Sequence, residues 1–318
     1  MIAACAALFL ATWIGCGGDK SPRAAEPASA AAEKVALTGR VLFLGIDGCR
    51  YDCLDKAQAP HLKRLRDAGC YADDTLIQGA RYKASDTVSG PGWSSLLTGV
   101  WADKHGVDDN RFSAPEFDRY PMFFRRVRQA DPQAETAAFS NWPPISEAIV
   151  CDADLNLKFG TEEHYARGDR DTAAAAVDSL RRGNPRAVFA YFGQVDAHGH
   201  EFGFSSESPQ YMAAIERADA LVGTVIDALV RRTNYKDENW LVLVSTDHGG
   251  FNNDHRNGHN KPQVMRGFTI VSGAAAARGK LTEQTYIVDV PVTALTHLGV
   301  KIKPEWELDG RAVGLKKR

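Results

Sequence analysis

The stretch VLFLGID, residues 41–47, is an apolar run that stops at an acidic residue. Two later stretches have the same design: AVFAYF at residues 187–192 precedes Asp196, and WLVLVS at residues 240–245 precedes Asp247. Short apolar runs bounded by turn residues are typical of strands buried on both faces. Amphipathic stretches separate these runs along the chain. This alternation predicts a mostly parallel sheet with helices on both faces.

The spacing of apolar residues along the rest of the chain predicts the other strands and helices. Further strands are expected at residues 137–140 and 268–271. Helices are expected at residues 60–68, 120–130, 172–182, 209–232 and 291–298, with a short one that ends near Thr98-Gly99. The pattern predicts one α/β domain, a three-layer α/β/α sandwich, over residues 39–318.

Composition narrows the class of protein. The chain has 318 residues, of which 44% are hydrophobic and 25% charged, and these values are typical of a soluble globular protein. Its net charge of -2 argues against a nucleic-acid-binding surface, which normally carries a basic excess. After the N-terminus, no apolar stretch approaches the ~18–20 residues that a membrane span needs.

The N-terminus predicts export. Residues 1–15 form a short apolar leader that ends in a small residue, as in a signal peptide, and Cys16 follows directly, as in a bacterial lipoprotein. Trp13 and the absence of a basic n-region depart from that pattern, and a buried first element is the alternative. Residues 16–38, rich in Ala, Pro and Ser, are expected to be a tether. We therefore expect a periplasmic or cell-envelope protein that contacts the membrane only through a lipid on Cys16.

Four further cysteines leave the redox state open. Export would permit disulfides, and Cys49, Cys53, Cys70 and Cys151 allow three pairings. Four buried free thiols are an equally good interpretation.

Acidic residues and histidines follow the predicted strands. In open α/β sheets, ligands bind beyond the carboxyl ends of the strands, so Asp47, Asp196 and Asp247 should meet at one edge. His200 lies four residues after Asp196, and His248 directly follows Asp247. A single Asp after a strand is more often a cap. The combined set of carboxylates and imidazoles instead indicates zinc ligands.

A nucleophile is expected beside these ligands. Ser89 precedes a Gly-Pro-Gly turn that leads into the helix ending near Thr98-Gly99. A hydroxyl at a helix start lies near backbone N–H groups and the positive end of the helix dipole, which favour an alkoxide and a developing phosphate charge. The alternative is that Ser89 is only an N-cap.

Five motifs in order carry a family resemblance. They are Gly45-Ile46-Asp47-Gly48, Ser89-x-Pro with Thr98-Gly99, Asp196-x-x-x-His200, Asp247-His248-Gly249 and Gly258-His259. The chain from about Val41 to Val271 resembles the alkaline phosphatase superfamily, and most closely its type I phosphodiesterase/nucleotide pyrophosphatase branch. The resemblance implies an alkaline phosphatase-like fold and a two-zinc hydrolase of phosphoric esters, with a phosphodiester or pyrophosphate as substrate.

The resemblance also implies roles for single residues. Asp47, Ser89, Asp247 and His248 would surround one zinc, with Ser89 as the nucleophile that becomes a phosphoserine. Asp196, His200 and His259 would hold the second zinc, and His255 is the competing residue for the last of these positions.

The substrate contacts follow from the same comparison. Gly90, through its backbone N–H, and Asn110 are the candidates to contact substrate, although Asn110 could equally be a turn residue. The branch usually has Thr as nucleophile, and it usually has Asn at the position of Gly92.

Other functions remain as alternatives. A phosphomonoesterase of the alkaline phosphatase type would share the metal ligands. A sulfatase is disfavoured because Trp93 stands where that family needs Arg, and because His200, His248 and His259 suit zinc better than calcium. A surface lipoprotein that binds without turnover would be expected to lack a ligand or the nucleophile. The small phosphoester that serves as natural substrate and the oligomeric state stay open.

Overall fold

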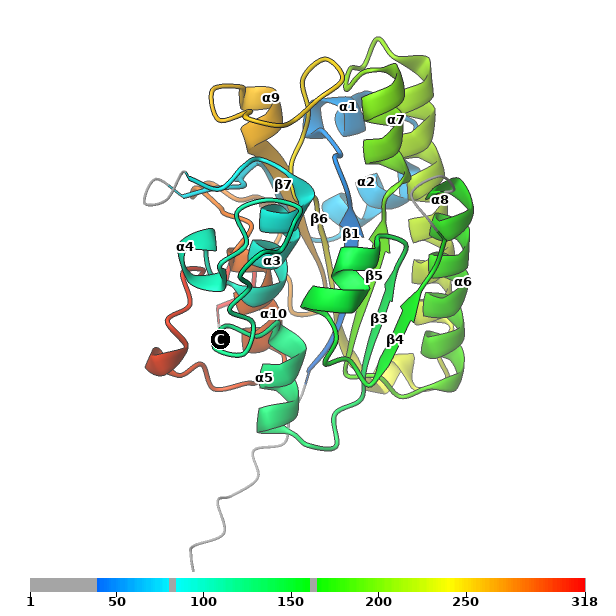
Figure 1. Ribbon diagram of the computed structural model, residues 1–318. Helices are drawn as coiled ribbons and strands as arrows, with labels where there is room; N and C mark the ends of the chain where they lie inside the picture. The colour runs from blue at the N-terminus through cyan, green and yellow to red at the C-terminus, as the bar shows by residue number, and fades with distance from the viewer. Residues whose placement is uncertain (1–38, 80–83, 161–164, 318) are drawn as a thin grey trace, which may run out of the picture. The chain divides into compact units, whose positions relative to one another are not determined.

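The computed structural model describes residues 39–79, 84–160 and 165–317. Within these residues one sheet has the strand order β4-β3-β5-β1-β6-β7-β2-β8 (Figure 1). The strands are β1 Gly39–Ile46, β2 Cys70–Leu76, β3 Thr136–Ser140, β4 Leu155–Lys158, β5 Ala187–Phe192, β6 Asn239–Ser245, β7 Arg266–Gly273 and β8 Gly279–Lys280. The five strands β4, β3, β5, β1 and β6 are neighbours in that order and run parallel to one another. Strand β7 runs antiparallel to both β6 and β2, and β8 runs parallel to β2. The expected mostly parallel sheet is confirmed.

Helices cover both faces of the sheet. The α-helices are α1 Tyr51–Lys56, α2 Pro60–Asp67, α3 Ser89–Thr98, α4 Ala102–His105, α5 Phe123–Ala130, α6 Tyr165–Arg182, α7 Gln194–Phe202, α8 Pro209–Val230, α9 Pro262–Met265 and α10 Asp289–His297. Shorter turns are η1 Ile145–Ile149, η3 Tyr235–Asp237 and η4 Pro304–Trp306. Helices α1, α2, α6 and α8 pack on one face, and α3, α5 and α10 pack on the other. The three-layer α/β/α sandwich predicted from the sequence is therefore present.

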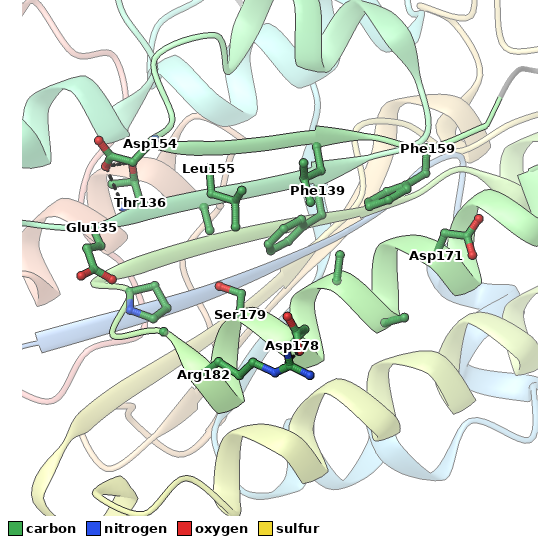
Figure 2. Close-up of a pocket in the computed structure, with 16 residues that line it drawn as sticks. Glu135, Thr136, Phe139, Asp154, Leu155, Phe159, Asp171, Asp178, Ser179 and Arg182 are labelled. Atoms are coloured by element: carbon green, nitrogen blue, oxygen red, sulfur yellow. Dashed lines mark hydrogen bonds and ion pairs between the residues drawn. The ribbon is translucent and has the colours of Figure 1, made fainter.

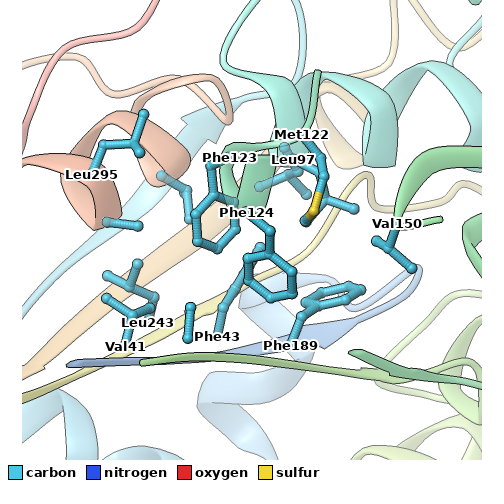
Figure 3. Packing of buried hydrophobic residues seen from close by; sticks show 14 of the residues in the cluster. Val41, Phe43, Leu97, Met122, Phe123, Phe124, Val150, Phe189, Leu243 and Leu295 are labelled. Carbon is cyan, nitrogen blue, oxygen red and sulfur yellow. The ribbon is translucent and has the colours of Figure 1, made fainter. Parts of the chain in front are cut away.

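The two faces of β1 supply two separate apolar layers. Val41 and Phe43 belong to the layer under α3, α5 and α10, whereas Leu42 and Leu44 belong to the layer under α6 and α8. This division follows from the alternation of side chains along a strand. Figure 3 shows the first layer, in which Phe43 of the sheet lies near the aromatic side chains of α5. The uninterrupted apolar run from Val41 to Ile46 is thus explained by burial on both faces.

The structure moves the starts of two helices by three residues or more. Helix α5 begins at Phe123, after Pro121, and not at Tyr120. Helix α6 begins at Tyr165, well before the expected Thr172, although its first turns contain Gly168. Gly168 packs against the Asn141 side chain, where a Cβ would lie 2.6 Å from the Asn141 Cβ. A packing requirement therefore explains a glycine that disfavours a helix on propensity alone.

Several expectations fall on residues outside the described part of the chain. The signal peptide, Cys16 and the tether up to residue 38 lie there. Among the described residues, no helix is both long enough and apolar enough to cross a bilayer. Cys49, Cys53 and Cys70 are buried, Cys151 is exposed, and these four are free thiols.

Candidate active site

Three adjacent strands bring the acidic residues together. β5, β1 and β6 are parallel neighbours in the middle of the sheet, so their carboxyl ends share one edge. Asp47 directly follows β1, Asp247 comes after β6, and Asp196 lies in the first turn of α7 after β5. The juxtaposition expected from the strand-end rule is what the structure has.

Ser89 begins the helix that faces this edge. It is the first residue of α3, and Val88 occupies the N-cap position without a side-chain cap. Its Oγ lies 3.2 Å from His248 Nε2 and 3.5 Å from Asp47 Oδ1. The N-cap alternative is therefore excluded, because the hydroxyl faces the acidic residues instead of the helix backbone.

The first group of ligand atoms, here called the Ser89 cluster, contains Asp47, Ser89, Asp247 and His248. His248 Nε2 lies 3.5 Å from Asp47 Oδ1 and 3.2 Å from Asp247 Oδ2. For metal–ligand bonds of about 2.0–2.2 Å, the edges of a tetrahedron are about 3.3–3.6 Å. The separations in this cluster match those of a ligand set around one small cation.

The second group, the His255 cluster, contains Asp196, His200 and His255. The two Nε2 atoms are 2.9 Å apart, and Asp196 oxygens lie 3.4 Å from His200 Nε2 and 3.5 Å from His255 Nε2. Ligand atoms of Asp47, Asp196 and His248 also lie within 4.8 Å of one another. Asp196 therefore links the two clusters.

The structure places His255, and not the expected His259, beside Asp196 and His200. His259 Nε2 lies 3.0 Å from the Ser85 backbone oxygen. Thr87 determines the difference: its Oγ1 donates to the His255 carbonyl at 2.5 Å and accepts from the Gly258 backbone N–H at 2.8 Å. These bonds hold His255 beside the start of α3, whereas His259 lies against Ser85.

The hydrogen bonds of the three histidines assign their tautomers. Nδ1 of His200 lies 2.9 Å from the Asn253 carbonyl, that of His248 2.8 Å from the Gly249 carbonyl, and that of His255 2.9 Å from the Thr87 carbonyl. A carbonyl only accepts, so each Nδ1 carries a proton, and in the neutral form of such a ring Nε2 holds a lone pair. Metal-binding histidines are held in this way. Two such lone pairs at 2.9 Å repel one another unless a proton or a metal cation lies between them.

The pKa values of the clustered carboxyl groups and imidazoles also favour a bound cation at this site. Burial raises the pKa of Asp47, and burial together with repulsion from Asp47 raises the pKa of Asp196 and Asp247 well above the usual carboxyl range. Burial lowers the pKa of His248 and of His255 to about 3. Asp196 Oδ1 and Asp247 Oδ2 are buried with no hydrogen-bond partner among the described residues. Orphaned acceptors of this kind are costly, and a bound cation would satisfy them.

Asp47 has partners that the sequence did not reveal. Its Oδ2 accepts from Trp93 Nε1 at 2.8 Å and from the Tyr191 hydroxyl at 2.7 Å. The sequence pattern indicated Tyr191 only as a strand residue. One signal was present: Trp93 lies four residues after Ser89, on the same helix face.

Gly90 and Asn110 are in contact, which changes the expected role of Gly90. The Gly90 backbone N–H donates to Asn110 Oδ1 at 2.7 Å, so this N–H serves to orient the amide. A Cβ on Gly90 would lie 2.6 Å from the Asp109 carbonyl oxygen and 2.9 Å from Asn110 Oδ1. Glycine at position 90 is therefore what allows the Asn110 loop to approach Ser89.

Gly92 is explained by packing. A Cβ at this position would lie 2.8 Å from the Asp247 Cβ and 3.0 Å from the Asp247 carbonyl oxygen. The position faces a ligand of the Ser89 cluster closely, so it has no space for a side-chain donor.

A large cavity of about 770 Å³ lies elsewhere, between β3, β4 and α6 (Figure 2). Phe139, Leu155, Leu157 and Phe159 contribute apolar walls to it. No member of the Ser89 cluster or the His255 cluster lines this cavity. It plays no part in the site at the sheet edge.

Solved structures share this architecture. Murine ectonucleotide pyrophosphatase/phosphodiesterase 5 in complex with AMP has a TM-score of 0.61 at 15% identity, over 84% of this chain and 96% of that one. Phosphonate monoester hydrolase from Silicibacter pomeroyi has a TM-score of 0.65 at 16% identity, over 87% of this chain and 76% of that one. The chain therefore shares the fold of these two proteins.

Sequence comparison identifies the family. The profile of the type I phosphodiesterase/nucleotide pyrophosphatase family matches residues 41–291, and the chain belongs to this family of phosphoester hydrolases. It is 23% identical over 235 residues to an uncharacterized pyrophosphatase/phosphodiesterase of Schizosaccharomyces pombe, covering 66% of this chain and 44% of that protein. It is also 23% identical over 234 residues to the human bis(5'-adenosyl)-triphosphatase, covering 67% of this chain and 48% of that protein. The chain thus spans less than half the length of these relatives.

Proposed function

We propose that this chain is a two-zinc hydrolase of phosphoric esters with Ser89 as its nucleophile. The observation that carries the proposal is the 2.9 Å approach of two Nε2 atoms whose rings both use Nδ1 toward carbonyls. The orphaned oxygens of Asp196 and Asp247 support it. Imidazole and carboxylate at these separations are a donor set that fits zinc. Asp47, Ser89, Asp247 and His248 would hold one ion, and Asp196, His200 and His255 the other.

The chain's own residues would act in two displacements. Ser89 Oγ forms a bond to phosphorus while the bond from phosphorus to the leaving oxygen breaks, which gives a phosphoserine. A water then attacks the phosphoserine, the bond from phosphorus to Oγ breaks, and Ser89 is restored. When bound, the two cations neutralise the three carboxylates, favour the ionised serine hydroxyl and stabilise charge on the phosphoryl oxygens.

Asn110 supplies the side-chain donor in this scheme. Its Oδ1 accepts from the Gly90 N–H, so the exposed Nδ2 group is the end that can donate to a phosphoryl oxygen. An Asn110→Asp protein keeps the acceptor for Gly90 but loses the donor and gains a negative charge. We expect its kcat/KM to fall by about 10²-fold or more.

The substitution Asn156→Asp is a control, because it makes the same amide-to-carboxylate change away from the site. Asn156 Nδ2 donates to the Ser146 carbonyl at 2.8 Å, on the edge strand β4. Asn156→Asp should leave kcat/KM unchanged. Wild-type kcat/KM in Asn110→Asp would remove Asn110 from the reaction.

The substrate class is proposed to be a phosphodiester or pyrophosphate. The names of the relatives and the AMP bound in the murine structure support this choice. Purified protein should hydrolyse bis(4-nitrophenyl) phosphate faster than 4-nitrophenyl phosphate and should not hydrolyse 4-nitrophenyl sulfate. Faster cleavage of the monoester would show that the protein is a phosphomonoesterase and not a phosphodiesterase. Cleavage of the sulfate alone would contradict both assignments.

We further propose export and a lipid anchor at Cys16, on the basis of the leader sequence alone. In bacteria fed labelled palmitate, the wild-type protein should carry the label in the membrane fraction, and Cys16→Ser should not. An unlabelled wild-type protein would contradict the anchor.

A further inference from the structure

We propose that Trp93 and Tyr191 are positioning residues that fix the orientation of Asp47 for metal binding. This inference rests on the proposed function, because it assigns a role toward the ion of the Ser89 cluster. Both residues donate to Asp47 Oδ2, at 2.8 Å and 2.7 Å, and leave Oδ1 toward Ser89 and His248. Oδ2 of Asp47 thus accepts the two hydrogen bonds, and Oδ1 remains available to a cation.

The two donors come from separate elements around β1. Trp93 lies one helical turn after Ser89 on α3, so the same helix presents the nucleophile and a donor to Asp47. Tyr191 on β5 is the register partner of Gly45 on β1, two residues before Asp47. Trp93 is 0% exposed and Tyr191 is 2% exposed, so neither hydrogen bond competes with bulk water.

Packing fixes the two rings in place. A Cβ on Gly45 would lie 2.4 Å from Trp93 Cη2, so the absence of a side chain at position 45 makes room for the indole. The Trp93 and Tyr191 rings meet edge to face, with centroids 5.2 Å apart. Rings held by neighbours in this way present their donors with little freedom to rotate.

The two hydrogen bonds restrict rotation of the Asp47 carboxylate about its terminal torsion. The terminal torsion of an aspartate is broad, so an unrestrained carboxylate can rotate and exchange its oxygens. Two donors on Oδ2 restrict that rotation and leave Oδ1 as the oxygen available to a cation. Partners that orient a metal ligand typically change metal affinity by about 10–100-fold when they are removed.

Zinc affinity of the metal-stripped protein tests the role directly. Tyr191→Phe removes one hydroxyl with little change of shape, and Trp93→Phe removes the indole N–H. Each protein is titrated with Zn²⁺ against a chromophoric chelator, and no activity measurement is needed. We expect each variant to bind the Ser89-cluster ion about 10–100-fold more weakly than wild type.

Two other sites in the chain provide matched controls. Trp240, 3% exposed, donates Nε1 to Glu238 Oε2 at 2.7 Å, and Tyr120, 5% exposed, donates its hydroxyl to Glu307 Oε2 at 2.6 Å. Trp240→Phe and Tyr120→Phe lose the same kind of bond to a carboxylate outside the site, so their zinc affinity should equal that of wild type.

The outcomes separate this inference from the proposed function. Wild-type zinc affinity in Tyr191→Phe would overturn the positioning role, as would an equal loss of affinity in the control variants. If Trp93→Phe fails to fold, the near-isosteric Tyr191→Phe decides alone. A wild-type protein that binds no zinc would instead overturn the proposed function, and this inference with it.

Discussion

Ser89→Ala should hydrolyse a phosphodiester at least about 10³-fold more slowly than wild type, because it lacks the oxygen that we propose attacks phosphorus. The Ser89 hydroxyl is the group that faces both Asp47 and His248 from the start of α3. Initial rates with bis(4-nitrophenyl) phosphate measure the loss. The zinc content should stay close to that of wild type, since Asp47, Asp247 and His248 remain.

Ser94 offers the control on the same helix. Its Oγ is buried without a hydrogen-bond partner among the described residues, so Ser94→Ala removes a hydroxyl that contributes little. Ser94→Ala should keep the wild-type rate. A Ser89→Ala protein that also kept this rate would show that another group attacks phosphorus.

His255→Ala should lose the ion of the His255 cluster and with it most of the activity, by about 10²-fold or more. The remaining ligands, Asp196 and His200, would leave that site with two side chains. Zinc per chain, measured by mass spectrometry after gel filtration, should fall by about one ion. The hydrolysis rate should fall in parallel.

His259→Ala is the matched control, because His259 lies against the Ser85 carbonyl and outside the His255 cluster. It should retain wild-type zinc content and rate. If His259→Ala lost zinc and His255→Ala kept it, the assignment of ligands made from the structure would be reversed, and the motif Gly258-His259 would have been the better guide.

The fold was largely predictable because its central strands are buried on both faces. β1, β5 and β6 are apolar at nearly every position, and β5 ends where the sequence indicated. β2 was not predicted, because only Cys70, Ala72 and Thr75 of CYADDTL are buried, which breaks the alternation, and two acidic residues lie within it. α7 was not predicted either, because its sequence QVDAHGHEF has two site residues, Asp196 and His200, and a glycine between them. The spacing of apolar residues does not predict an element where polar or site residues occupy positions that core residues would otherwise take.

The site was predictable as far as topology decides it. Asp47, Asp196 and Asp247 meet because parallel strands place their carboxyl ends at one edge. The choice between His255 and His259 depends on bonds from Thr87, which is distant in sequence and cannot be inferred from spacing. The contact of Gly90 with Asn110 and that of Tyr191 with Asp47 likewise arise only from tertiary packing.

Metal content together with metal-dependent turnover tests the central claim most directly. Purified protein should contain about two zinc ions per chain, lose phosphodiester hydrolysis on exhaustive chelation, and recover it when Zn²⁺ is restored. A metal-free protein that hydrolyses the diester as fast as the untreated one would contradict the account.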